Sequence, residues 1–126
     1  MRLLLDTHVV LWQLSGARSL GAHARETIAA AGELAFSVVS FAEIGVKAAI
    51  GKLAVPPDLY AHVVGTGVRV LGLSAEHGLA VASLPLHHRD PFDRLLVAQA
   101  RQEGFTLVTA DPRIQPYDVA VLDPLA

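Results

Sequence analysis

The segment DPFDRLLVAQARQEG, residues 90–104, predicts a helix together with both of its ends. Asp90 is a typical N-cap residue, Pro91 suits the first helical turn, and Gly104 is a typical C-cap residue. Between these ends the chain carries an apolar face formed by Leu95, Leu96, Val97, Ala98 and Ala100. A strand-like run at 105–109 follows directly, so the chain passes from a helix into a strand with almost no loop.

Helical and strand-like segments alternate in the same way along the remaining sequence. Strands are expected at residues 3–5, 34–39, 68–71, 105–109 and 119–122. Helices are expected at residues 9–14, 19–32, 40–51, 56–67, 74–84 and 90–104. This alternation predicts right-handed βαβ crossovers and a parallel sheet. We therefore predict an α/β sandwich in which residues 1–126 form one domain.

Composition excludes several classes of protein. With 52% hydrophobic and 17% charged residues, the chain is too apolar for a disordered protein. No apolar run approaches the roughly 18 residues that a membrane span needs, and the run at 3–5 ends at Asp6, too early for a signal peptide. We therefore expect a cytoplasmic protein.

The charge balance and the absence of cysteine limit the chemistry further. Without cysteine there is no disulfide, no thiolate metal site and no Cys nucleophile, so a metal must be held by oxygen or imidazole. The net charge of −2 lacks the basic excess that binds nucleic acid passively. If the chain acts on RNA, cations must assist.

Four acidic residues are expected at one edge of the predicted sheet. Asp6 follows the first strand, Glu43 is expected in the first turn of the helix after the second, Asp93 in the first turn of the helix at 90–104, and Asp111 just beyond the strand at 105–109. In a parallel sheet all the strands end at the same edge, where helix N-termini also point. The four side chains are therefore expected to lie near one another.

Taken singly, each acid also has a purely structural explanation. Asp6 and Asp90 are suitable helix caps. Ser40 and Glu43 match the capping box S-x-x-E, and Glu43 could pair with Lys47 one turn later. These explanations do not account for acids gathered at one edge, because neighbouring carboxylates repel each other and raise one another's pKa unless a cation neutralises them. A site with only oxygen ligands favours Mg²⁺ or Mn²⁺ and phosphoryl-transfer chemistry.

Other polar and aromatic residues are weaker candidates. Thr109 could orient a water or a phosphate, or simply bond to the backbone at the end of a strand. His87 and His88 are expected in a solvated loop, since no third ligand is spaced to match them. Arg94 is expected to contact RNA or a partner, or to pair with an acid on the surface. Trp12 is expected in the core or an interface.

Four segments in order resemble the PIN-domain family, in particular the VapC-type toxins of bacterial toxin–antitoxin pairs. They are LLLDTH at 3–8, SFAEI at 40–44, DPFDRLLVAQA at 90–100 and TAD at 109–111. Each segment alone is weak, but together they span nearly the whole chain.

The resemblance implies a three-layer α/β/α sandwich around a parallel sheet of four or five strands. It also implies an endoribonuclease dependent on Mg²⁺ or Mn²⁺, commonly a homodimer silenced by a small antitoxin protein. The three strict acidic positions of the family fall on Asp6, Glu43 and Asp93, and the less strict acidic and hydroxyl positions fall on Asp111 and Thr109. The expected reaction is in-line hydrolysis of RNA without a side-chain nucleophile.

Three alternatives belong to other functional classes. A receiver domain would need a pair of acids after the first strand and a lysine after the last, whereas Asp6 stands alone and Pro124 follows Asp123. A haloacid-dehalogenase-like phosphatase would need a second Asp where His8 stands. A member of the same fold that binds RNA or a partner without cutting is the third.

Overall fold

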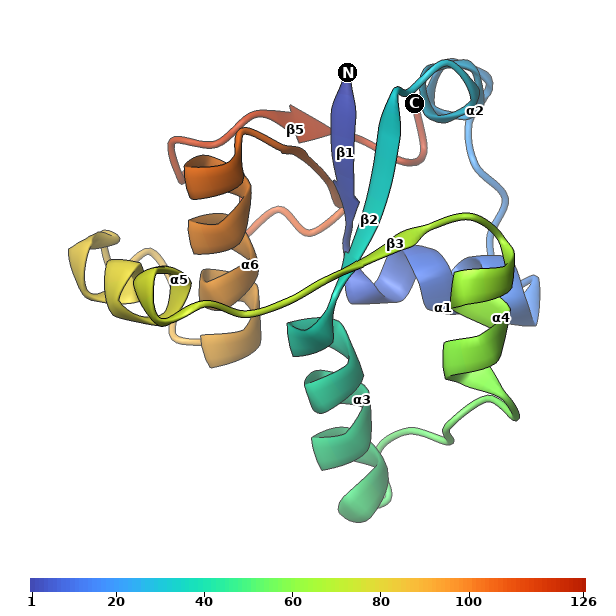
Figure 1. The fold of residues 1–126 in the computed structure, drawn as a ribbon, viewed down its shortest axis with the longest axis horizontal. Coiled ribbons are helices and arrows are strands. Elements are labelled where there is room, and N and C mark those ends of the chain that lie inside the picture. Colours follow the sequence, from blue (N-terminus) through green and yellow to red (C-terminus); the bar gives the residue numbers. More distant parts are fainter.

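A five-stranded parallel sheet forms the centre of the computed structural model, which describes residues 1–126 (Figure 1). Its strands are β1 (Arg2–Leu5), β2 (Glu33–Ser37), β3 (Arg69–Leu71), β4 (Thr106–Val108) and β5 (Val121–Leu122). They are ordered β3-β2-β1-β4-β5, and all four neighbouring pairs are parallel. The expected strand directions and strand number are confirmed.

Six α-helices and one short 3₁₀ helix connect these strands. They are α1 (Thr7–Ser15), α2 (Ala22–Ala29), α3 (Val38–Ala49), α4 (Leu59–Gly65), α5 (Ala75–Ala80), the 3₁₀ helix Val81–Ser83 and α6 (Pro91–Glu103). The helix expected at 19–32 is therefore shorter than predicted, and the one expected at 74–84 changes to 3₁₀ geometry after Ala80. No helix combines the length and the apolar character needed to cross a membrane.

Helix α6 begins and ends where its sequence predicts. The side chain of Asp90 accepts hydrogen bonds from the backbone N–H groups of Phe92 and Asp93, at 2.9 and 3.1 Å. Gly104 ends the helix in the left-handed conformation, with φ of 72°, which a glycine adopts without the steric penalty of a Cβ. The N-cap at Asp90 places Asp93 in the first turn.

The start of α3 differs from the prediction. Ser37, not Ser40, is the N-cap, and its hydroxyl accepts a hydrogen bond from the backbone N–H of Val39. The capping box expected between Ser40 and Glu43 is therefore wrong, and Glu43 lies in the second turn rather than the first. The cause is tertiary, because Ser40 is fully buried and bonds to Thr7.

Apolar side chains pack on both faces of the sheet. Along β1, Leu4 belongs to the cluster that packs against α6, whereas Leu3 and Leu5 belong to the cluster that packs against α1 and α4. This alternation follows from the two-residue repeat of a strand. In Figure 1, α5 and α6 cover one face and α1 and α4 the other, which confirms the three-layer arrangement.

The strand order creates a crevice at the C-terminal ends of β1 and β4. From β1 the chain continues to β2 and β3 on one side of the sheet, and then crosses to β4 and β5 on the other. In open parallel sheets, ligands bind where the direction of winding reverses in this way. Asp6 directly follows β1, and Thr109 directly follows β4.

Candidate active site

Asp6 is held rigidly at this crevice. It is the N-cap of α1, as expected, and its Oδ1 accepts a hydrogen bond of 2.7 Å from the backbone N–H of Thr7. Its Oδ2 accepts a second bond of 2.7 Å from the hydroxyl of Thr109. Burial is the main cause that raises the pKa of Asp6, and the negative charge of Glu43 adds to the effect.

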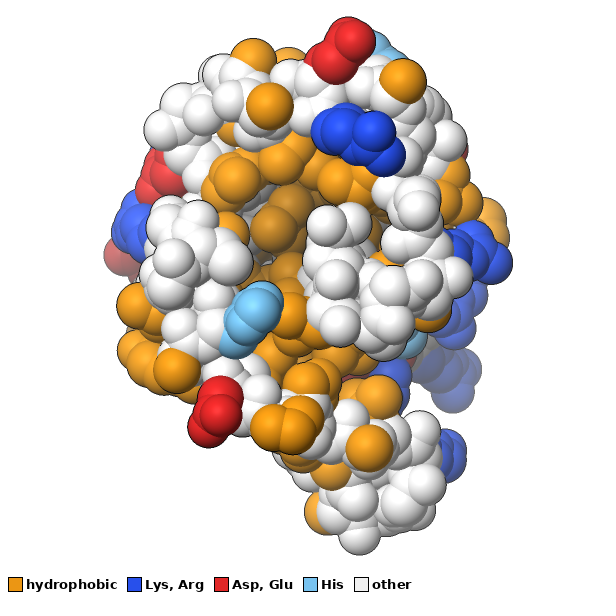
Figure 2. Space-filling view, turned by 90° about the vertical axis from the view of Figure 1, so that its right-hand side faces the viewer, with side chains coloured by type: hydrophobic (Ala, Val, Ile, Leu, Met, Phe, Trp, Pro, Cys, Tyr) orange, Lys and Arg blue, Asp and Glu red, His pale blue; other side chains and the backbone are white.

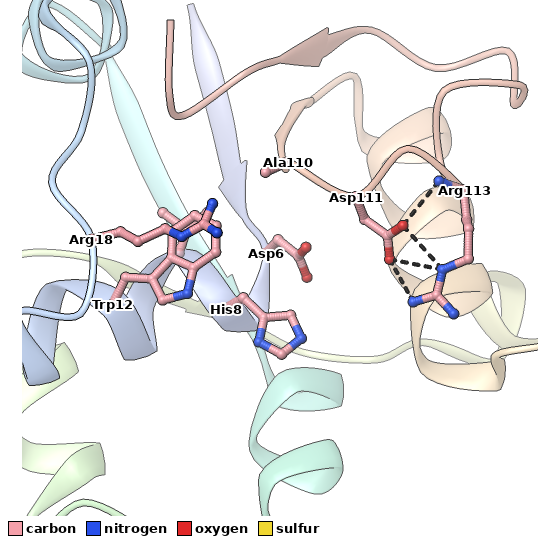
Figure 3. A pocket seen from close by; sticks show the side chains of 8 residues that line it. Asp6, His8, Trp12, Arg18, Ala110, Asp111 and Arg113 are labelled. Atoms are coloured by element: carbon pink, nitrogen blue, oxygen red, sulfur yellow. Dashed lines mark hydrogen bonds and ion pairs between the residues drawn. The ribbon is translucent and has the colours of Figure 1, made fainter.

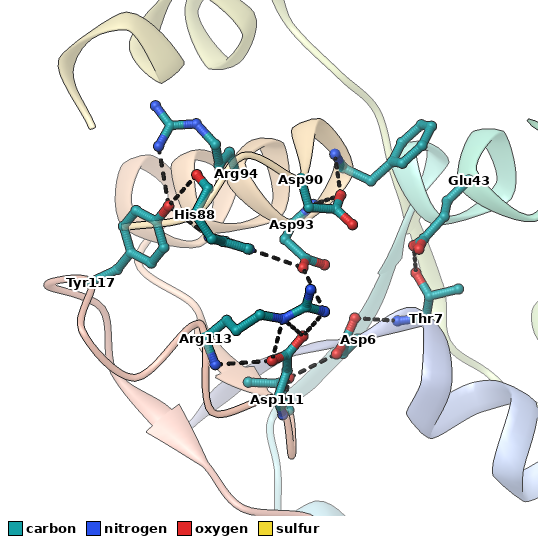
Figure 4. Close-up of polar contacts among 12 residues, drawn as sticks. Asp6, Thr7, Glu43, His88, Asp90, Asp93, Arg94, Asp111, Arg113 and Tyr117 are labelled. Atoms are coloured by element: carbon teal, nitrogen blue, oxygen red, sulfur yellow. Dashed lines mark hydrogen bonds and ion pairs between the residues drawn. The ribbon is translucent and has the colours of Figure 1, made fainter. Parts of the chain in front are cut away.

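Thr7 connects Asp6 to Glu43 (Figure 4). Its backbone N–H bonds to Asp6, and its hydroxyl donates to Oε1 of Glu43 at 2.7 Å. The other carboxylate oxygen of Glu43 pairs with Lys47, which confirms the expected pair one turn apart in α3. Glu43 is buried, with 3% of its surface exposed, so Lys47 supplies the positive charge that its carboxylate needs in a poorly solvated place.

Asp93 lies in the first turn of α6 and faces the crevice. Its Oδ2 is 3.1 Å from Nε2 of His88 and 4.0 Å from Nη2 of Arg113. The pKa of Asp93 is raised from 3.8 to about 6, first by burial and then by the negative charges of Asp90, Asp6 and Asp111, while the bond to His88 acts in the opposite direction.

Asp111 is bound to Arg113. The guanidinium Nη2 is 2.7 Å from Oδ2, and Nε is 3.0 Å from Oδ1. This pairing holds the pKa of Asp111 below its ordinary value. The backbone N–H of Asp111 also donates to the hydroxyl of Thr109 at 3.1 Å. Thr109 therefore makes the backbone bond that its position at the end of a strand suggested, and it also bonds to Asp6.

The four predicted acids thus lie around one crevice, although they do not form a ready metal site. Each carboxylate is bonded to its own hydroxyl, backbone or cationic partner, and no three Asp, Glu or His side chains are already arranged to hold an ion. Their charges nevertheless act on one another. The negative charges of Asp6 and Asp111 help to raise the pKa of Asp93, and that of Glu43 helps to raise the pKa of Asp6. A divalent cation would offset this repulsion, and a set of carboxylate oxygens suits Mg²⁺ or Mn²⁺. The residues therefore fit such an ion.

Two expectations for the basic residues are wrong. His87 is exposed in the loop before α6, as expected, but the side chain of His88 is 9% exposed and bonds to Asp93 and Tyr117. Arg94 is neither a surface residue nor available to RNA. It is buried and donates to the backbone carbonyls of residues 81, 84 and 85.

Arg113 and Tyr117 also belong to the site and were not predicted from the sequence. Arg113 lies two residues after Asp111, and that spacing is the one signal that could have suggested an Asp–Arg pair. Tyr117 is far along the chain from His88 and reaches it only because the segment after β4 folds back toward α6 (Figure 4). No local pattern marks such a contact.

A groove of about 310 Å³ opens beside Asp6. It extends from Asp111 and Arg113 to Trp12 of α1 and to Arg18 in the loop after α1, whose guanidinium is 5.1 Å from the centre of the Trp12 ring (Figure 3). Trp12 is half-buried, as expected for a residue packed at the core, but it also lines this groove. The groove therefore joins the acids to two arginines and an aromatic surface.

Solved structures of similar fold include several VapBC complexes. The chain is similar to VapBC2 from Rickettsia felis bound to a DNA fragment from its promoter, with a TM-score of 0.73, 18% identity and coverage of 97% of this chain and 98% of that one. It is also similar to VapBC-1 from nontypeable Haemophilus influenzae, with a TM-score of 0.69, 20% identity and coverage of 98% of both chains. At these identities the likeness shows the fold.

Sequence comparison identifies the family. The chain is 32% identical over 117 residues to Ribonuclease VapC22 of Mycobacterium tuberculosis (strain ATCC 25618 / H37Rv). This match covers 90% of each protein. The PIN domain family model matches residues 3–120. These matches, together with the parallel sheet and the acids at its crevice, show that the chain belongs to the PIN-domain family.

Proposed function

We propose that this chain is an endoribonuclease that hydrolyses RNA phosphodiester bonds with Mg²⁺ or Mn²⁺ and acts as the toxin of a toxin–antitoxin pair. The observation that carries this proposal is the group of carboxylates at the crevice between β1 and β4, where burial and mutual repulsion raise the pKa of Asp93 to about 6. Membership of the PIN-domain family and the similarity to Ribonuclease VapC22 support it.

Asp6 and Asp93 would hold the cation, with Glu43 and Asp111 beside them. A bound divalent ion supplies positive charge next to the scissile phosphodiester and makes a water molecule more acidic. Thr7 and Thr109 keep Asp6 in place, because each donates one hydrogen bond to a different oxygen of its carboxylate. This leaves the carboxylate little freedom to rotate, and such preorganisation lowers the cost of holding an ion or orienting a water.

The groove beside Asp6 would take the RNA. Arg18 and Arg113 can meet phosphate oxygens, and the ring of Trp12 offers a surface for a base or a sugar. Local positive charge is needed because the whole chain has a net charge of −2, so that an RNA strand is not drawn to its surface as a whole.

An antitoxin would cover a second, apolar hollow on the other side of α1. This hollow of about 310 Å³ lies between α1, α2 and α4, and nine of its twelve lining residues are hydrophobic, among them Leu14, Leu20, Ile28 and Val63. Figure 2 shows it as an apolar depression in the face that carries α1 and α4. The solved complexes of similar fold support an antitoxin as the occupant. We also propose that the chain is a homodimer and acts in the cytoplasm.

A cleavage assay with purified, antitoxin-free protein tests the proposal. We expect RNA to be cut in Mg²⁺ or Mn²⁺ and not after chelation with EDTA, and Asp6→Asn or Asp93→Asn to abolish cutting while the protein stays folded. Asp118→Asn is the matched control, because Asp118 is exposed and lies beside the C-terminal end of α6 and the start of β4, at the opposite end of these elements from the crevice. Cleavage that survives EDTA, or wild-type rates in both crevice variants, would refute the proposal. RNA binding without cleavage would favour the silent member of the fold.

A further inference from the structure

A chain of hydrogen bonds leads from a buried arginine to Asp93. Nη1 of Arg94 is 3.1 Å from the hydroxyl oxygen of Tyr117, and that oxygen is 2.9 Å from Nδ1 of His88. On the opposite side of the ring, Nε2 of His88 is 3.1 Å from Oδ2 of Asp93. These hydrogen bonds connect three separate segments, namely α6, the loop before it and the turn after β4 (Figure 4).

The direction of each bond follows from what each group can donate. A guanidinium only donates, so the oxygen of Tyr117 accepts from Arg94. The single hydroxyl proton of Tyr117 then has two acceptors within reach, Nδ1 of His88 at 2.9 Å and the backbone carbonyl of His88 at 3.4 Å. The shorter distance favours Nδ1. A ring nitrogen that accepts is unprotonated, so the proton of a neutral His88 lies on Nε2 and is donated to Asp93.

Arg94 is the fixed first member of this series of hydrogen bonds. Besides Tyr117, its guanidinium donates to the carbonyls of Val81, Leu84 and Pro85, at 3.1, 3.2 and 2.8 Å. Because the buried guanidinium donates to four acceptors, it is held in one position. Tyr117 is also buried, and the rings of His87 and His88 pack edge-on against it. The imidazole of His88 is therefore held in place on both sides.

The two oxygens of Asp93 differ as a result. Oδ2 is bonded to His88, whereas Oδ1 makes no hydrogen bond in the structure. No side-chain oxygen or nitrogen that is fully shielded from solvent lacks a partner, so Oδ1 must be accessible. Asp93 thus presents one anchored oxygen and one free oxygen at the crevice.

We propose that His88 and Tyr117 are positioning residues for Asp93. Tyr117 selects the His88 tautomer protonated on Nε2, and His88 anchors Oδ2 so that Oδ1 is directed at a divalent cation. This inference rests on the proposed function, because it assumes that Asp93 binds the ion. Partners of this kind orient metal ligands, and their loss commonly weakens metal binding by 10- to 100-fold.

Mn²⁺ affinity measured on a set of folded variants tests the proposal without any cleavage assay. His88→Leu removes the donor, and we expect it to weaken Mn²⁺ binding by about 10- to 100-fold. His88→Gln offers an amide N–H at nearly the same place, and we expect it to restore most of the affinity. Tyr117→Phe removes only the hydroxyl, and we expect an intermediate loss. Urea unfolding of each variant establishes that it is folded before titration.

Nitrogen-15 NMR of the histidine-labelled wild-type protein at alkaline pH, where imidazoles are neutral, tests the tautomer directly. We expect His88 protonated on Nε2, and a mixture of tautomers in Tyr117→Phe. A wild-type His88 protonated on Nδ1, or a folded His88→Leu protein that binds Mn²⁺ as tightly as the wild type, would overturn the inference and leave the proposed function standing. A wild-type protein that bound no Mn²⁺ would refute the proposed function and the positioning role together.

Discussion

Replacement of Asp93 by Asn is expected to stabilise the metal-free protein at neutral pH. In the folded chain the pKa of Asp93 is raised from 3.8 to about 6, mainly by burial and then by the neighbouring carboxylates. At neutral pH folding must therefore keep a carboxylate charged where its charge is disfavoured. Asn removes that charge and still offers an oxygen to Nε2 of His88.

The size of the effect follows from the pKa. A rise from 3.8 to about 6, at about 1.4 kcal/mol per pH unit, corresponds to a penalty of about 3 kcal/mol. The side chain is only 8% exposed, so solvent screens little of this penalty, but burial of the polar Asn amide costs free energy as well. We therefore expect Asp93→Asn to raise the free energy of unfolding by about 2 kcal/mol.

The effect must also depend on pH in a particular direction. Well below pH 3.8 the carboxyl is protonated in both the folded and the unfolded chain, so the electrostatic advantage of the variant should disappear there. Between about pH 4 and the folded-state pKa of about 6, the unfolded chain releases its proton first, so wild-type stability falls relative to the variant. Above that range the difference should be constant.

Urea unfolding in EDTA at several pH values, followed by far-ultraviolet circular dichroism, measures this difference. Asp118→Asn is the control, because it makes the same chemical change at an exposed side chain. A difference between Asp93→Asn and wild type that did not change with pH, or a variant less stable than wild type at neutral pH, would refute the electrostatic description of the crevice.

Three further predictions concern residues around the site. Thr7→Val removes the buried hydroxyl that bonds Glu43 and should lower the free energy of unfolding by about 1 to 3 kcal/mol; equal urea midpoints would mean that this bond contributes nothing. Arg113→Gln frees Asp111 from an exposed ion pair worth up to about 1 kcal/mol and should tighten Mn²⁺ binding up to about fivefold in calorimetry; weaker binding would show that Arg113 does not compete with the ion. Gly45→Ala adds a Cβ that meets no atom within 4 Å and should stabilise α3 by up to about 1 kcal/mol; a lower melting temperature would contradict the open surface there.

Local chemistry was sufficient to predict α6. An N-cap, a proline in the first turn and a glycine C-cap all act within a few residues, so Asp90, Pro91 and Gly104 define that helix from the sequence alone. The same reasoning failed at Ser40, because its hydroxyl is used by Thr7, 33 residues away along the chain. A local capping motif determines where a helix begins only if its side chain is not already bonded in a tertiary contact.

In the candidate site, too, some features could be predicted from the sequence and others depend on tertiary contacts. Strand ends could be located from the sequence, and the rule that parallel strands end at one edge was enough to bring Asp6, Asp93 and Asp111 together. The partners of those acids could not be found in this way. His88 and Arg113 are placed by loops, and the bonds that fix loop side chains join residues whose separation in sequence carries no periodic signal.

Metal binding by the crevice is the claim on which the proposed function depends. A crystal structure of the protein grown with Mn²⁺, with the ion located by its anomalous scattering, tests it most directly. We predict one or two ions at the C-terminal ends of β1 and β4, in contact with carboxylate oxygens of Asp6 and Asp93. A crevice without manganese at saturating concentration, with Asp93 still bonded only to His88 and Asp111 still bonded to Arg113, would contradict the account.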